Sequence, residues 1–233
     1  MHFEFYISKD SEKKQLIEMF QEDDPLGLKD RAKQYNFPVD LAVKINSEPL
    51  QVWKPELLKL LDNTYDHNLK FLKESASFFM NYWRKNEGRF FPILEDLFKK
   101  KLPTYYVLLA HYVAGTSDWH GVDICTNAYS HKWKGKDCHA YFLLFEVILS
   151  QVFMMVRKEH DEESLSDFDL WKVSELVAFV VLHKEWDYFN YIKKTNYEQI
   201  DDHIEEAMVL YNNKQNLKDF IYKSIELLQR RIH

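Results

Sequence analysis

The sequence predicts an α+β fold that is mostly helical and contains a small β-sheet. Apolar residues at helical spacing recur through most of the 233 residues, whereas the alternation typical of strands is confined to a few short segments. Apolar residues make up 46% of the chain and charged residues 29%, so the chain can bury a substantial core. Because we find no long linker and no internal repeat, we expect one domain over residues 1–233. Its expected parts are an N-terminal strand with helices (1–102), a central core (103–182) and C-terminal helices (183–233).

The chain is expected to begin with a half-buried strand over residues 1–7, where apolar residues occupy every second position. Asp10 or Ser11 can cap the helix that follows. We expect this helix to end at Asp24-Pro25, and residues 28–49 to form short, irregular elements.

A stronger helical pattern begins at Pro55, because proline suits the first position of a helix. A second helical stretch is expected to end near Gly88. The apolar spacing continues through residues 90–98, where Pro92 is compatible only with a first turn.

The amino-acid composition of the chain changes at Pro103. Residues 104–113 and 122–129 are rich in β-branched and aromatic residues and predict two strands, with residues 115–121 as the turn between them. Helical patterns then cover residues 137–157 and 169–182.

Two amphipathic helices are expected to close the chain. The first presents apolar residues between positions 200 and 211, and the second between positions 217 and 228.

The composition favours a cytoplasmic protein. The first residues lack the basic and apolar regions of a secretory signal. The most apolar window, residues 140–156, is shorter than a membrane span of about 20 residues, so we interpret it as a buried core helix and expect no membrane partner. Two cysteines, Cys125 and Cys138, are too few for a disulfide framework and suit a reducing compartment.

The candidate site is a set of polar side chains inside apolar helices. At about 100° per residue, four of them fall within about ±20° of one line along the helix at 137–157, namely His139, Glu146, Ser150 and Arg157. A fifth, Glu175, shares a helix face with Trp171 and Phe179. Burying a carboxylate is costly unless it has partners, so both glutamates should have a structural or chemical role.

Two interpretations of Glu146 and Glu175 remain open. Each carboxylate can accept hydrogen bonds from a tyrosine, lysine, arginine or histidine of a neighbouring helix, and the chain contains 14 tyrosines. Alternatively, the two carboxylates face one cavity, where burial raises the pKa of at least one of them into the range that acid–base catalysis needs.

The order strand, polar loop, strand, apolar helix with Glu146, and later helix with Glu175 resembles the gluzincin branch of the zincin-type metallopeptidases. In that family, the helix motif HExxH supplies two zinc-binding histidines and a general base, and a later helix supplies a third ligand. The resemblance covers residues 103–182 and implies that Glu146 matches the base and Glu175 the third ligand. Phe145 and Leu149 stand where the histidines would be. It therefore implies a degenerate zincin-like fold without a zinc site.

Other chemistries receive less support. Five potential metal ligands lie close together in the sequence, but their spacing matches no standard zinc module, so we expect no metal and no cofactor; they are His120, Cys125, His131, Cys138 and His139. Asp118 and His120 lie in the expected loop between the strands, where an Asp can orient a His. No nucleophile can be tied to them, although Cys125 and Cys138 are candidates.

The charge of the chain disfavours nucleic acid as a partner. The chain carries 31 Lys and Arg against 37 Asp and Glu, a net charge of −6, which opposes binding to a polyanion. Its basic clusters are short, at residues 99–101 and 132–136, and the second includes Trp133, which can stack on a base.

We therefore expect a non-catalytic protein that binds a protein or peptide on a pseudo-metallopeptidase scaffold. The alternative is a hydrolase that uses Glu146 and Glu175, with or without a divalent metal that accepts carboxylate ligands. Glu146 and Glu175 are its catalytic candidates, and His139, Ser150, Arg157, Asp118 and His120 are the candidate pocket residues.

Overall fold

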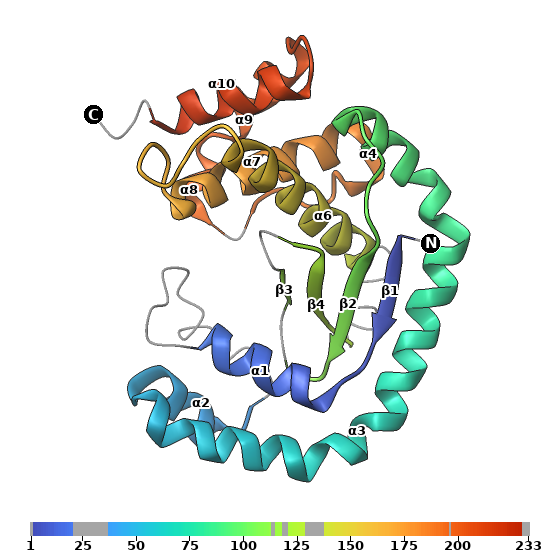
Figure 1. The fold of residues 1–233 in the computed structure, drawn as a ribbon, viewed down its shortest axis with the longest axis vertical. Coiled ribbons are helices and arrows are strands. Elements are labelled where there is room, and N and C mark those ends of the chain that lie inside the picture. The colour runs from blue at the N-terminus through green and yellow to red at the C-terminus, as the bar shows by residue number, and fades with distance from the viewer. Residues whose placement is uncertain are drawn as a thin grey trace.

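The computed structural model confirms an α+β fold that is mostly helical (Figure 1). The residues that it describes are 2–20, 37–112, 115–117, 121–128, 138–195 and 197–229, with the backbone alone at 115–117.

The sheet has the strand order β1-β2-β4-β3. Strands β1 (Phe3–Tyr6), β2 (Tyr105–Ala110) and β4 (Asp123–Asn127) are parallel, and β3 (Gly115–Ser117) is antiparallel to β4 at one edge. The prediction that residues 115–121 form only a turn was wrong, because Gly115–Ser117 form a strand. To begin β4 parallel to β2, the chain must return along the sheet, and β3 forms part of that return.

Helix α6 (Cys138–Arg157) packs on one face of the sheet and α7 (Asp167–Glu185) packs on α6, confirming the two central helices. By length and composition α6 could cross a membrane, but most of it is buried inside the fold, as expected for a core helix. After the short η3 (Asp187–Phe189), helices α8 (Glu198–Asp201), α9 (Ile204–Asn212) and α10 (Leu217–Gln229) pack on α7. The helix expected near 200–211 is thus interrupted at Asp202 and His203.

The opposite face of the sheet is partly covered by α1 (Lys9–Met19), α2 (Val39–Ser47) and the first half of α3 (Leu50–Asn86). The cap of α1 differs from both sequence candidates. Ser8 has extended backbone geometry, and its Oγ accepts a hydrogen bond from the backbone N–H of Ser11 at 3.2 Å. Asp10 and Ser11 therefore lie inside the first turn, because the helix begins at Lys9 and its cap lies two or three residues before the expected ones.

Helix α2 corrects part of the irregular region expected at 28–49. Its buried residues Leu41, Ala42 and Ile45 follow helical spacing, which turns one apolar stripe toward the core. The expected helix end at Asp24-Pro25 lies outside the described residues.

Helix α3 is one continuous element of 37 residues rather than two stretches. It begins at Leu50, so Pro55 lies inside it and not at its start. Proline removes one N–H there, and the many buried residues farther along α3 hold the helix together despite this loss. The helical turns after it are η2 (Glu87–Arg89) and α4 (Phe91–Phe98), with Pro92 in the first turn of α4 as predicted.

Two apolar clusters lie on the two sides of the sheet. One joins α4, α6, α7, α9, α10 and the second half of α3 to the sheet, and the other joins α1, α2 and the first half of α3 to the ends of β2 and β4. Figure 1 shows α3 curving around the outside of the molecule, from α1 and α2 past β1 to α4. Helix α3 therefore belongs to both clusters.

Candidate functional site

The two candidate carboxylates are buried, as the sequence predicts. The exposed fraction of Glu146 is 8% and that of Glu175 is 9%. Glu146 lies on α6 and Glu175 on α7, and these two helices pack against each other. Burial of this degree is unusual for glutamate and indicates that both side chains serve the fold or a site.

The carboxylate of Glu175 affects the pKa of Tyr141 on α6. Burial raises the pKa of the Tyr141 hydroxyl, and the nearby carboxylate of Glu175 raises it further. Tyr141 and Glu146 are five residues apart, which is about 140° around a helix. Glu175 therefore acts on a residue of α6 that lies about 140° around the helix from Glu146.

The polar candidates His139 and Ser150 of α6 contact different groups. The ring of His139 is fully buried among aromatic rings of α3, with centroid distances of 4.4 Å to Tyr82 and 4.8 Å to Phe79. The hydroxyl of Ser150 donates to the carbonyl oxygen of Val147 in its own helix, at 3.1 Å. These contacts serve packing within and between helices.

Gln151, which the sequence analysis did not select, links α6 to the sheet. Its Nε2 donates to the hydroxyl oxygen of Tyr105 on β2 at 2.7 Å, and both residues are buried. Burial raises the pKa of Tyr105 to about 12, so this hydroxyl stays neutral.

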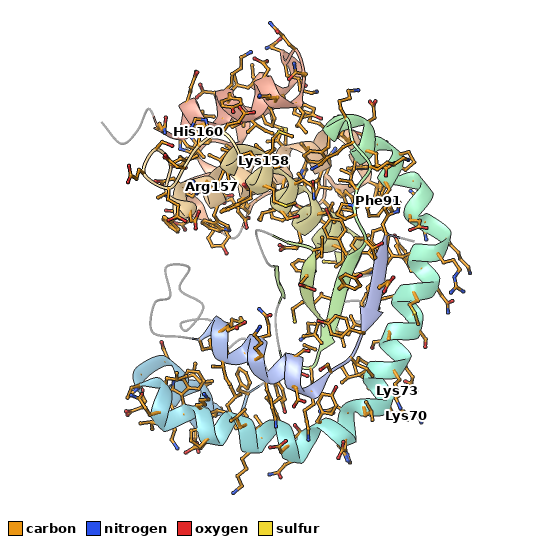
Figure 2. The ribbon with its side chains drawn as sticks, in the orientation of Figure 1. Lys70, Lys73, Phe91, Arg157, Lys158 and His160 are labelled. Atoms are coloured by element: carbon orange, nitrogen blue, oxygen red, sulfur yellow. The ribbon has the colours of Figure 1, made fainter. Side chains whose placement is uncertain are left out.

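Arg157 holds the connection between α6 and α7. Its guanidinium donates to the carbonyl oxygens of His160 (3.1 Å) and Leu165 (2.8 Å) and to the carboxylate of Asp167. Figure 2 shows Arg157, Lys158 and His160 together at the end of α6. The described hydrogen bonds of Arg157 are thus made to the segment that connects α6 with α7, and none of them is made to Glu146 or Ser150.

The remaining candidates fall partly outside the described residues. Asp118, His120, His131 and the basic cluster at 132–136 lie there. Cys125 is buried in β4, where burial raises the pKa of its thiol, and Cys138 begins α6. Among the described residues, no group of three or more His, Cys, Asp and Glu side chains could hold a metal ion.

Two of the three lysines of the first basic cluster have acidic partners. Lys99 pairs with Asp96, and Lys101 pairs with Glu95, each at 2.7 Å. These pairs reduce the positive field that a polyanion would meet at this cluster.

Sequence reasoning missed the buried carboxylate of Glu12 on α1. Its Oε1 accepts hydrogen bonds from the backbone N–H groups of His111 (2.7 Å) and Tyr112 (3.0 Å), directly after β2. Burial raises the pKa of Glu12, although these two bonds act in the opposite direction. A signal was available, because Glu12 occupies the same helical stripe as Leu16 and Met19.

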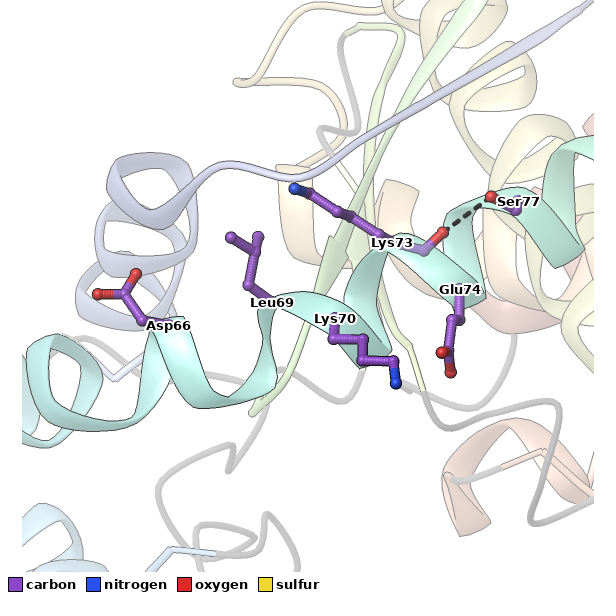
Figure 3. Close-up of a pocket in the computed structure, with 6 residues that line it drawn as sticks. All are labelled: Asp66, Leu69, Lys70, Lys73, Glu74 and Ser77. Carbon is purple, nitrogen blue, oxygen red and sulfur yellow. Dashed lines mark hydrogen bonds between the residues drawn. The ribbon is translucent and has the colours of Figure 1, made fainter.

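Two cavities among the described residues lie away from these carboxylates. One, of about 670 Å³, is an open hollow along α3 and is shown in Figure 3; it is lined by Asp66, Leu69, Lys70, Lys73, Glu74 and Ser77. The other, of about 390 Å³, lies between the start of α7 and the end of α10 and includes Glu162, Asp169 and His203. Neither is lined by a residue that the sequence selected.

The free edge of the sheet is a further feature that can bind a ligand. Strand β3 is the last in the order, so one side of its backbone is paired with β4 and the other with no strand among the described residues. Helix α6 contacts β3.

No family model, curated protein or solved structure is significantly similar to this chain.

Proposed function

We propose that this protein is a non-catalytic cytoplasmic protein that binds an extended peptide segment of another protein along the free edge of β3. The position of β3 at the end of the sheet carries this proposal. An edge strand offers a row of backbone N–H and C=O groups, and an extended peptide can pair with them as an additional strand.

The surroundings of β3 support this mode of binding. Helix α6 contacts β3, and α6 is itself buried between the sheet and α7. A strand supported in this way keeps its geometry when a peptide docks, so less ordering entropy is lost on binding.

The proposed scaffold is a pseudo-metallopeptidase. The succession of β2, β4, α6 with Glu146 and α7 with Glu175 is the order on which the resemblance to the gluzincins rests. Phe145 and Leu149 occupy the positions of the zinc histidines, and neither an aromatic ring nor an alkyl chain can bind zinc. Binding without hydrolysis is the activity that such a scaffold retains.

The test is selection from a library of random peptides displayed on phage, followed by affinity measurement for the selected peptides. Backbone N–H groups alternate in direction along a strand, so one of the adjacent residues Thr116 and Ser117 has its N–H pointing away from β4. We expect Thr116→Pro or Ser117→Pro, whichever removes the outward N–H, to weaken binding at least tenfold while keeping the thermal unfolding of the parent.

The other proline variant is the matched control, because it removes an N–H that points toward β4. It should lower the unfolding temperature. If both variants bind the selected peptides as tightly as the parent, the peptide does not pair with β3 and the proposal is wrong. A parent protein that selects no peptide also contradicts it.

One observation favours a second candidate, a hydrolase. The carboxylate of Glu175 on α7 is buried and interacts electrostatically with the partly buried hydroxyl of Tyr141 on α6, and perturbed groups of this kind often lie at active sites. This candidate predicts turnover of a peptide or ester substrate that is lost in both Glu146→Gln and Glu175→Gln.

Metal analysis tests the metal-dependent form of this hydrolase. Elemental analysis of the purified protein and thermal unfolding before and after a chelator give the readout. A stoichiometric metal whose removal lowers the unfolding temperature favours the hydrolase, whereas unchanged unfolding and no metal favour the binding protein.

A further inference from the structure

Part of the sheet face opposite α6 is open to solvent. Side chains alternate between the two faces, so Phe3 and Phe5 pack into the cluster on the α6 side while Glu4 and Tyr6 point the other way. On this opposite face, α1, α2 and the first half of α3 bury Leu108 and Ala110 of β2 and Cys125 of β4. The beginnings of the strands remain uncovered there.

Three residues form a row across this open face, which we call the acidic–tyrosine row: Glu4 on β1, Tyr106 on β2 and Asp123 on β4. The strand register places Tyr106 directly beside Glu4 and directly beside Asp123. All three are exposed, Tyr106 to 44%. Neighbouring strands are about 4.8 Å apart, so the two carboxylates flank the tyrosine ring on either side.

The charges of the row are not balanced by the described part of the chain. No ion pair there involves Glu4 or Asp123, and no described cation lies over the ring of Tyr106. The next residue of β1 on this face, Tyr6, is 37% exposed and extends the row. Burial and the nearby Asp123 carboxylate raise the pKa of the Tyr6 hydroxyl, which indicates that Asp123 lies along this face.

The openness of this face is itself unusual. Sheets of parallel strands are normally covered on both faces, since backbone and side chains are buried together. A parallel sheet that exposes tyrosines beside uncompensated carboxylates therefore has the composition of a surface that a partner covers.

We propose that the acidic–tyrosine row binds an arginine side chain of a partner protein. The planar guanidinium can stack on the ring of Tyr106, while its N–H groups donate to the carboxylates of Glu4 and Asp123. Lysine fits less well, because its ammonium is a point charge that cannot stack and donate in two directions at once. This surface lies on the opposite face from α6, and its binding does not depend on peptide pairing with β3.

The test uses three small probes with the purified, full-length protein: acetyl-arginine methylamide, its lysine counterpart and its citrulline counterpart. Citrulline keeps the planar shape and lacks the charge. NMR titration should show saturable shifts of the backbone amides of residues 4, 106 and 123 with the arginine probe. We expect the lysine probe to bind at least threefold more weakly and the citrulline probe not to saturate.

Two variants remove the proposed contacts. Tyr106→Leu keeps an apolar side chain but removes the ring, and the double variant Glu4→Gln with Asp123→Asn keeps the shapes but removes both charges. Each should weaken binding of the arginine probe at least threefold. Tyr191→Leu is the matched control, because Tyr191 is 54% exposed elsewhere in the chain, and it should bind as the parent does.

The proposal is overturned if the citrulline probe shifts the same amides as strongly as the arginine probe, or if Tyr106→Leu binds arginine as tightly as the parent. It is also overturned if sedimentation shows a self-associating protein whose dimerisation is abolished by Tyr106→Leu, because the row would then be covered by a second copy. A folded variant is verified by its amide spectrum, so loss of binding is distinguished from unfolding.

Discussion

At the scale of single residues, Glu12 is the most deeply buried carboxylate among the described residues. Its side chain has no exposed surface, and its Oε1 accepts hydrogen bonds from the N–H groups of His111 and Tyr112. The groups that face it from other elements include Tyr65 on α3 and Cys125 on β4, whose pKa values it raises. None of these neighbours is a cation, so burial dominates and raises the pKa of Glu12.

This environment predicts how Glu12 affects stability at different pH. Because the pKa of Glu12 is higher in the folded than in the unfolded chain, folding favours the protonated form. Its contribution is fully present below the unfolded pKa and is lost as the pH rises through the folded pKa. Glu12→Gln keeps the acceptor oxygen and cannot ionise, so we expect it to become more stable than the parent as the pH rises from 4 to 8. Urea unfolding across this pH range measures the effect.

Two further variants separate charge from hydrogen bonding. Glu12→Ala leaves the N–H groups of His111 and Tyr112 without this acceptor and should cost about 1–3 kcal/mol of unfolding free energy. Glu18→Gln on the exposed side of α1 should leave the pH profile unchanged. A Glu12→Gln profile parallel to that of the parent would show that Glu12 does not titrate differently in the fold.

How far single residues are predictable depends on whether their signal is local. The burial of Glu146 and Glu175 could be predicted, because a carboxylate among apolar residues of one helix is visible in the sequence. Their partners could not, since the electrostatic interaction of Glu175 with Tyr141 depends on how α6 and α7 pack. The row of Glu4, Tyr106 and Asp123 was equally hidden, because register brings together residues more than 100 positions apart.

At the scale of elements, the connection between α6 and α7 is held by polar contacts at both ends. Ser166 caps α7 and accepts from the N–H of Asp169 at 3.1 Å, and the Ser166 hydroxyl donates to the Asp169 carboxylate at 2.7 Å. Arg157 closes the other end by bonding the carbonyl oxygens of His160 and Leu165. These contacts fix the path of the chain between the two central helices.

We therefore expect Arg157 to stabilise the fold through the several hydrogen bonds that its planar guanidinium donates, and not through its charge alone. Arg157→Ala removes donors from two carbonyl oxygens and the Asp167 carboxylate, so we expect a loss of about 1.5–3 kcal/mol. Arg157→Lys should recover only part of this loss, because an ammonium cannot reproduce the planar fork. Chemical denaturation measures both. Lys158→Ala, at the next and exposed position, is the control. A loss of unfolding free energy in Lys158→Ala as large as that in Arg157→Ala would contradict this role.

Elements were predictable where their pattern is strong and local. Helices α6, α7 and α10 follow the apolar spacing of the sequence closely. Strand β3 could not be predicted, because three residues are too few to show a pattern and the strand exists only through its pairing with β4. The start of α3 was misplaced for a similar reason, since packing of Trp53 and Leu57 extends the helix across Pro55.

At the scale of the whole molecule, the two apolar clusters are joined by the sheet and by α3. Leu57 and Leu61 of α3 lie in the cluster with α1 and α2, whereas Leu72 and Phe79 lie in the cluster with α6. Strand β2 likewise contributes to both, one cluster from each of its faces. A rigid helix and a sheet that are shared in this way should transmit unfolding from one cluster to the other.

We therefore expect one cooperative unfolding transition for the whole chain. Leu57→Ala opens a cavity in one cluster and Leu176→Ala in the other, and each leucine is fully buried. Each variant should lose about 2–5 kcal/mol and shift the same single calorimetric transition to lower temperature. Val209→Ala, at a position 58% exposed, should leave the transition in place. Two separate transitions, of which Leu57→Ala moves only one and Leu176→Ala only the other, would show that the two clusters fold as independent units and that α3 does not couple them.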